Sequence, residues 1–228
     1  MIERQWSSLG ARDLFHVSVS GHAEGSLEDE TDRAIATAIA EIEAAGFSSG
    51  HIVRSRLFAR DREARSRASD RRRALLVGTL RGSSSSFCDA ERLSPDARMS
   101  IDLVAMRPRH GEARKIVREY EPAIAPPMFV MLDGLVFLSG ITDITPGLPM
   151  QIDTIRNSVE RSLRQAGTHL GAARLMSVFL AKGEDPQHAR ALIDAAFGTI
   201  ACPFTLSSVE AYSAPQKRIE IEVTAAMA

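Results

Sequence analysis

The chain has 228 residues, of which 44% are hydrophobic and 25% charged, and its formal net charge is -1. This is the composition of a globular protein with one large or two small domains, and the near-neutral charge gives no field that would steer nucleic acid or an anionic membrane. The sequence has only two cysteines and no Cys/His spacing of the kind that binds zinc. It also has no apolar run that approaches the roughly 20 residues of a membrane helix. We therefore expect a cytoplasmic protein without a metal, a cofactor, or a nucleic-acid or membrane partner.

The first half of the chain is predicted to fold in the order strand, helix, strand, helix, strand, strand. Apolar and polar residues alternate from Phe15 to Val19, which is typical of a half-buried strand. The helix that follows begins at Ser26, whose pairing with Asp29 resembles a capping box, and ends before Gly46. We expect the remaining strands at 52–59, 84–90 and 98–105, and a second helix at 62–77.

The second half repeats this order. A continuous apolar run from Leu135 to Leu138 predicts a strand, and the apolar stripe of the next helix ends before Gly167. The second helix of this half is expected to begin at Asp185 as N-cap, with Pro186 in the first helical position. The remaining strands are expected at 175–181, 207–211 and 218–225.

The two halves share an internal repeat, because three separated segments match at a near-constant offset of about 120 residues. The matched segments are 45–61 with 166–183, 17–21 with 136–140, and 100–105 with 220–225, and within the first of these Gly50 meets Gly171 and Phe58 meets Phe179. We therefore predict two copies of one domain, at 1–108 and 128–228, joined by a charged, proline-rich linker at 109–127.

Each domain is predicted to be of the α/β (α+β) class, with a mixed sheet and two helices on one face of it. In the last strand, Ile219 and Ile221 alternate with Glu220 and Glu222, so one face of that strand is polar. A polar face turned away from the helices requires a polar cavity or a partner.

Several short motifs carry a family resemblance. They are "VSGH" (19–22) and "LSGI" (138–141), followed by "LSPDARMSIDLVA" (93–105) and "SAPQKRIEIEVTA" (213–225). The pattern occurs once in each half, and together the two occurrences cover nearly the whole chain. In this pattern the sequence resembles a duplicated member of the RidA (YjgF) superfamily. The resemblance implies chorismate-mutase-like α/β domains, a homotrimer, and small-molecule pockets in clefts between neighbouring domains. It also implies hydrolysis of reactive enamines or imines derived from amino acids, which is a deaminase-type reaction.

The resemblance further implies site residues on the closing strand and at an arginine clamp. The acidic position that orients water corresponds to Asp102 in the first half and Glu222 in the second. The clamp for the substrate carboxylate falls at Ser85 and Thr205, neither of which is arginine. Arg81 lies close to the first of these positions, and we name it, with Thr205, as a substrate-binding residue.

The Ser-Gly loops are the other expected substrate-binding residues. They are Ser20, Gly21 and His22 in the first half, and Ser139 with Gly140 in the second. Glycine at a strand end permits close approach of the backbone to a ligand. The family's aromatic hydroxyl from the segment before the first strand is absent at its usual place, where this sequence has proline and methionine.

Three functions remain open at this point. The protein either hydrolyses an enamine or imine, or binds a small carboxylate without chemistry, or acts as a divergent lyase or hydrolase on chorismate-like substrates. The missing clamp arginine in the second half favours the binding protein. The arginines between 54 and 73 alternate with acidic residues and lack aromatic partners, so we interpret them as a solvated helix face rather than a nucleic-acid surface.

Overall fold

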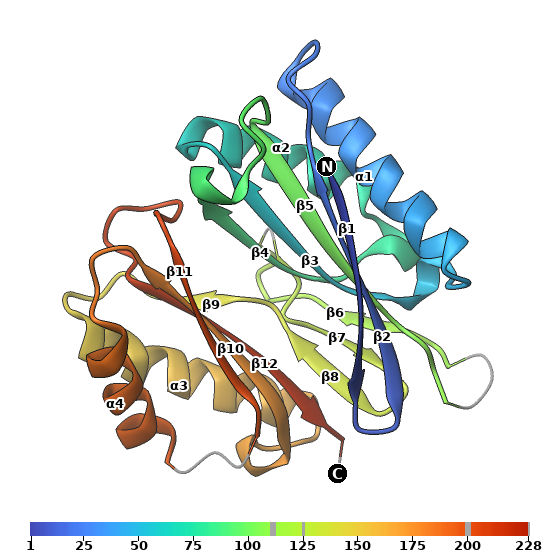
Figure 1. Ribbon diagram of the computed structural model, residues 1–228. Helices are drawn as coiled ribbons and strands as arrows, with labels where there is room; N and C mark the ends of the chain where they lie inside the picture. Colours follow the sequence, from blue (N-terminus) through green and yellow to red (C-terminus); the bar gives the residue numbers. More distant parts are fainter. Residues whose placement is uncertain (110–112, 125, 199–201, 228) are drawn as a thin grey trace.

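The structure is a computed structural model that describes residues 1–109, 113–124, 126–198 and 202–227. Residues 110–112 and 125 of the predicted linker therefore lie outside the described residues. Two β-sheets lie between two pairs of helices, and each helix pair covers the outer face of its own sheet (Figure 1). The predicted class, with two helices on one face of each mixed sheet, is confirmed.

The first sheet has the strand order β1-β2-β5-β3-β4, in which β3 and β4 are parallel and the other neighbours antiparallel. Its elements are β1 (Ile2–Leu9), β2 (Arg12–Ser20), α1 (Leu27–Ala44), β3 (Ile52–Ala59), α2 (Arg62–Leu75), β4 (Ser83–Cys88) and β5 (Met99–Met106).

The second sheet has the order β11-β10-β12-β8-β7-β6, and β9 also pairs with β12. Its elements are β6 (Ile116–Arg118), β7 (Phe129–Leu132), β8 (Leu135–Leu138), β9 (Ile141–Thr142), α3 (Leu148–Gln165), β10 (Ala173–Ala181), α4 (Pro186–Phe197), β11 (Phe204–Val209) and β12 (Ile219–Ala226). β6 falls inside the predicted linker and pairs with β7, so this part of the linker extends the second sheet.

Local signals place the helix starts where the sequence predicts them. Ser26 and Asp29 form both hydrogen bonds of a capping box at the start of α1. Asp185 caps α4 by accepting a hydrogen bond from the Gln187 amide, with Pro186 next in the helix. Among the described residues, no helix has the length and apolarity needed to cross a membrane.

Each domain has its own core under its helix pair, and the two domains also contact each other along an interface, here called the seam. At one end of the seam, Val53 and Val104 of the first sheet pack with Phe137 of the second. At the other end, the rings of Phe87 and Phe179 stand 4.3 Å apart. Apolar contacts at both ends fix the two sheets face to face, and the residues between these ends are polar.

Candidate functional site

The seam is closed by two hydrogen bonds, one of them to a side chain, between β4 of the first domain and the Ser-Gly loop of the second. The Ser84 amide donates to Ser139 Oγ at 2.9 Å, and the Gly140 amide donates to the Ser84 carbonyl at 3.2 Å. The hydroxyl of Ser139 is thus engaged in joining the domains, and β4 is brought alongside β12 and its carboxylates.

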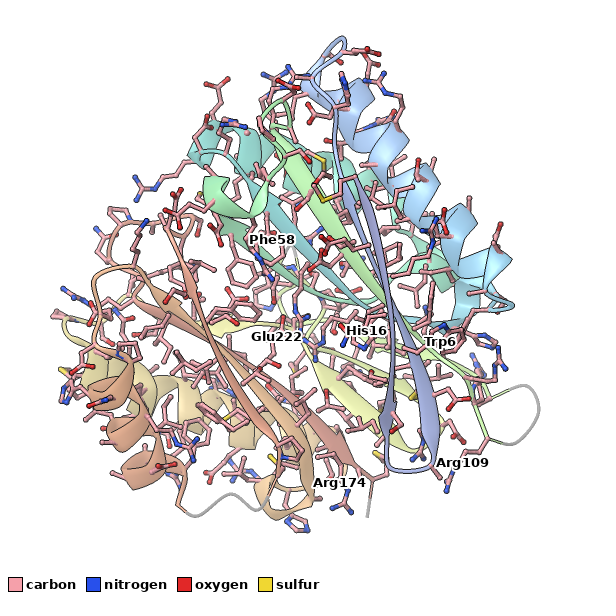
Figure 2. The ribbon with its side chains drawn as sticks, viewed as in Figure 1. Trp6, His16, Phe58, Arg109, Arg174 and Glu222 are labelled. Atoms are coloured by element: carbon pink, nitrogen blue, oxygen red, sulfur yellow. The ribbon has the colours of Figure 1, made fainter. Side chains whose placement is uncertain are left out.

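A buried ion cluster lies in the middle of the seam. Arg54 Nη1 and Arg56 Nη2 lie 2.8 and 2.7 Å from Glu222 Oε2, and Ser85 Oγ donates to Glu222 Oε1 at 2.6 Å. Glu222 lies at the junction of the two domains, with His16 on the side of the first (Figure 2). Burial alone would raise the pKa of Glu222, but Arg54 and Arg56 outweigh it and lower the pKa to about 2. Glu222 is therefore ionised at neutral pH.

Glu220, two residues earlier on the same strand, has different surroundings. Its side chain is 5% exposed, and its Oε1 atom is buried without a hydrogen-bond partner among the described residues. A Cβ added at Gly140 would lie 1.7 Å from this oxygen, so the glycine makes room for the carboxylate. Burial raises the pKa of Glu220 to about 7, helped by the charge of Glu222 and opposed by Ser85, Lys217 and Arg65.

Glu220 lines a cavity of about 470 Å³ between the domains. The first domain contributes α2 and β4 to its walls, and the second contributes β9, α3 and the start of β12. The chain before β7 adds Tyr120, Ile124, Pro126 and Pro127. Tyr120 thus supplies an aromatic side chain to this cavity.

Four of the cations on this cavity lack a carboxylate partner among the described residues. Arg65 and Arg72 come from α2, Arg161 from α3, and Lys217 from the loop before β12. Among the described residues, none of these four has a carboxylate within 4.0 Å, and their hydrogen bonds go to hydroxyl and carbonyl oxygens.

Arg72 is the most enclosed of these cations. It is 8% exposed and donates to the Ser85 carbonyl at 2.7 Å and to Ser86 Oγ at 2.9 Å. Burial lowers its pKa to about 10. A buried guanidinium held only by neutral oxygens favours an anion in the adjacent cavity.

A second cavity, of about 640 Å³, lies on the inward face of the first sheet. Asp102, Ser20 and His16 line it, together with Arg56, which also reaches Glu222. Burial raises the pKa of Asp102, opposed by Ser18 and Arg56, whereas burial and the nearby arginines lower the pKa of His16 to about 4.

The substrate-binding residues predicted from the sequence lie in different parts of the structure. Arg81 and Gly140 line the inter-domain cavity, and Arg81 also donates to Glu119 at 3.0 Å. Gly21 abuts the carboxylate of Glu30, which pairs with Arg98 within the first domain.

Two further predicted residues lie away from both cavities. The side chain of His22 is 68% exposed, and Glu24 is the only carboxylate within 4.0 Å of it among the described residues. Thr205 is exposed on the edge strand β11. The structure therefore does not bring these two together with the carboxylates.

Sequence reasoning missed several cavity residues. The interpretation of the arginines between 54 and 73 as a solvated face is wrong for Arg54 and Arg72, which are buried. A signal for Arg72 existed, since it follows Ala64 and Ala68 at four-residue intervals on the buried stripe of α2. Among the described residues, no group of three or more His, Cys, Asp or Glu side chains is placed to hold a metal ion.

Comparison with known proteins identifies relatives by structure only. No protein-family model matches the sequence, and no curated protein matches it. A chorismatase structure matches 98% of this chain and 77% of its own, at 14% identity and a TM-score of 0.64. Two smaller proteins each match 50% of this chain and 99% of their own, at 22% identity and a TM-score of 0.45. They are a member of the YjgF/YER057c/UK114 family from Mycobacterium tuberculosis and a protein of the Rid family from Yersinia pestis. At 14% identity, the chorismatase match shows a shared fold across both domains and nothing beyond the fold.

Proposed function

We propose that this tandem protein of RidA-like fold binds a small carboxylate-bearing metabolite in the cleft between its two domains. The observation that carries the proposal is the set of cations on the 470 Å³ cavity, Arg72 above all, that lack a carboxylate partner among the described residues. A cavity of this volume suits a small molecule. Arg65 and Arg72 of α2 stand in for the clamp arginine that is missing at Ser85, because a guanidinium can hold a carboxylate through two parallel hydrogen bonds.

The reaction that fits this cleft is hydrolysis of an enamine or imine. Water adds to the C=N bond, and the resulting amino alcohol releases ammonia to leave a 2-oxo acid. The cations hold the ligand carboxylate, and Glu220 of β12 lines the same cavity, where a carboxyl group can assist proton transfer. The sequence prediction names Glu222 for this work in the second domain and Asp102 in the first.

Freshly generated 2-iminopropanoate is the direct probe of this function. Pyruvate release above the buffer rate that is lost in Arg72→Met identifies an enzyme acting in the cleft. Binding of pyruvate without turnover of the imine identifies a binding protein instead. If neither pyruvate nor the imine interacts with the full chain, the proposed function is wrong.

One observation favours a second candidate ligand, a dicarboxylate of the chorismate type. Arg65 and Arg72 lie on the first domain, whereas Arg161 and Lys217 lie on the second, so cations face the cavity from both sides. The chorismatase whose fold matches this chain is consistent with such a ligand. Incubation with chorismate, followed by analysis of the products, separates this candidate from imine hydrolysis.

We also propose a homotrimer in the cytoplasm. Within the chain, the β4 side of the first domain contacts the β8–β9 side of the second. The equivalent of β4 in the second domain is β11, a sheet edge without a strand partner on its outer side among the described residues, and the equivalent of the second Ser-Gly loop is Ser20–Gly21 at the end of β2. Such a head-to-tail contact can be repeated by further copies until a ring closes. Light scattering should give about three times the chain mass of 24.8 kDa, and a mass of 24.8 kDa would exclude the ring.

A further inference from the structure

Glu220 and Glu222, the two carboxylates on the inward face of β12, differ in how many of their oxygen atoms have hydrogen-bond or ion-pair partners. Both oxygens of Glu222 are occupied, by two arginines and a hydroxyl. Protonation of Glu222 would leave Arg54 and Arg56 buried without a full counter-charge. Glu222 is also not among the described residues that line the inter-domain cavity.

Glu220 has the opposite properties. It lines the cavity, it is 5% exposed, and its buried Oε1 receives no hydrogen bond from the described residues. Its position depends on Gly140, where any side chain would collide with Oε1 and with Ser85 Oγ, the latter at 2.4 Å from an added Cβ. The Oε1 atom is thus held at the cavity without a hydrogen bond from the described residues, and Ser85 is the hydroxyl that favours the ionised form of Glu220.

Charged and titratable groups from several elements surround Glu220, and Arg161 of α3 lines the same cavity. The surrounding groups are Glu222 on β12, Lys217 before β12, Arg65 and Arg72 on α2, Arg54 and Arg56 on β3, and Tyr212 after β11. Burial outweighs the attraction of the cations and brings the pKa of Glu220 to about 7. At neutral pH both protonation states are populated, which is the condition for efficient acid and base catalysis.

We propose that Glu220 is the proton-transfer group of the inter-domain cleft and that Glu222 is a positioning residue. Glu222 fixes Ser85, Arg54 and Arg56 beside the cleft and stays ionised throughout. This inference rests on the proposed function, because it assigns the proton chemistry of the same cavity to a residue that the family resemblance does not name.

The proposed step balances without a further reactant. The Glu220 carboxyl donates its proton to the imine nitrogen while the oxygen of a water molecule forms a bond to the imine carbon. The new carboxylate of Glu220 accepts the proton lost by that water. In the second stage Glu220 gives this proton to the amine and takes the proton of the hydroxyl, so that the C–N bond breaks, ammonia leaves and a 2-oxo acid remains.

Turnover of 2-iminopropanoate tests the assignment directly. Glu220→Gln should lower kcat by about 10²–10⁴-fold, the range for loss of a general acid or base, with KM changed by less than about threefold because binding is retained. A variant with the wild-type kcat would overturn the assignment.

Positioning by Glu222 and its partners is tested through the pH profile. Glu222→Gln removes a negative charge beside Glu220, so the pH profile for kcat should move to lower pH. Because this variant leaves two buried arginines unpaired, Ser85→Ala serves as the milder test. Loss of the hydroxyl that lowers the pKa of Glu220 should move the profile to higher pH. Unmoved profiles in both variants would contradict the positioning role.

NMR of the full chain with isotope-labelled glutamate separates failure of this inference from failure of the proposed function. We expect one carboxyl resonance that titrates near pH 7, vanishes in Glu220→Gln, and titrates at higher pH when pyruvate brings a second negative charge into the cleft. If pyruvate binds but this resonance keeps its titration, the inference is wrong and the proposed function stands. If pyruvate perturbs no resonance, the proposed function is wrong and the inference fails with it.

Discussion

Asp102 on β5 and Glu222 on β12 occupy the same position of the repeated domain, yet their surroundings differ completely. Glu222 is 1% exposed and is bound by two arginines and a hydroxyl from the other domain. Asp102 faces an open cavity on its own sheet, and among the described residues no salt bridge within 4.0 Å reaches it. The difference arises because β12 is covered by the first sheet, whereas the corresponding part of β5 is not covered by the second.

This comparison shows how a duplication can make two unlike sites from one domain. An acidic residue at a fixed place in the fold acquires its charge state from whatever packs against it. Arginines from the partner domain lower the pKa of Glu222 to about 2, whereas burial without a close counter-ion raises the pKa of Asp102. The protonation state of each of these carboxyl groups therefore depends more on the residues that pack against it than on its position in the last strand of its domain.

The largest expected effect is on stability, when each carboxylate is replaced by its amide. Glu222→Gln should lower the free energy of unfolding by about 3–5 kcal/mol, because it leaves Arg54 and Arg56 buried without their counter-ion. Asp102→Asn should change it by less than about 1 kcal/mol, since no buried ion pair is broken. Urea unfolding measures the loss of stability in both variants. Equal losses in Glu222→Gln and Asp102→Asn would show that contacts between the domains do not distinguish the two positions.

The next effect is the pH dependence of stability. The pKa of Glu220 is raised from 4.5 to about 7 on folding, so its contribution to stability is fully present below pH 4.5 and is lost as the pH rises through 7. Wild type should therefore lose about 3 kcal/mol relative to Glu220→Gln between these pH values.

The stability of wild type has to be compared with that of Glu220→Gln at each pH, because a second, partly buried group titrates over the same pH range. The pKa of His16 is lowered from 6.5 to about 4, so its contribution is present above pH 6.5 and is lost as the pH falls. Urea unfolding from pH 4.5 to 8 isolates the part due to Glu220. Parallel curves for wild type and Glu220→Gln would refute the raised pKa.

The smallest effect separates neighbouring arginines on α2. Arg72→Met should weaken pyruvate binding by about 10–100-fold, the worth of charge-assisted hydrogen bonds. Arg71→Met is the matched control, because Arg71 lies on the outer side of the same helix and pairs with Asp32 of α1. Calorimetry should find an unchanged Kd for Arg71→Met, and equal weakening in both variants would point to a general charge effect instead of a cleft contact.

Much of the fold is predictable from the sequence because its elements carry strong local patterns. The capping box at Ser26 and the start of α4 at Asp185 follow from residue types at fixed spacing. β1 is harder to predict, since seven of its eight residues are exposed and no hydrophobic alternation marks the strand. It pairs with β2 through backbone hydrogen bonds, which leave no pattern in the sequence, and through the contact of Trp6 with Phe15, which only the fold brings together.

The candidate site is only partly predictable, because it is built where two domains meet. The polar face of β12 is visible in the alternation of Glu220 and Glu222 with isoleucines. The residues that meet this face come from β3 and β4, more than 130 positions away along the chain. Alternation shows that Arg54 or Arg56 has a preferred side of its strand, but it does not indicate which surface of the other domain will cover that side.

The number of pyruvate molecules bound per chain, measured by calorimetry, tests the central claim most directly. One site per chain, weakened by Arg72→Met and retained in Arg71→Met, is the result that a single cation-lined cleft between the domains predicts. Two equivalent sites per chain, or binding that is indifferent to Arg72, would show that the inter-domain cavity is not the distinctive site of this protein.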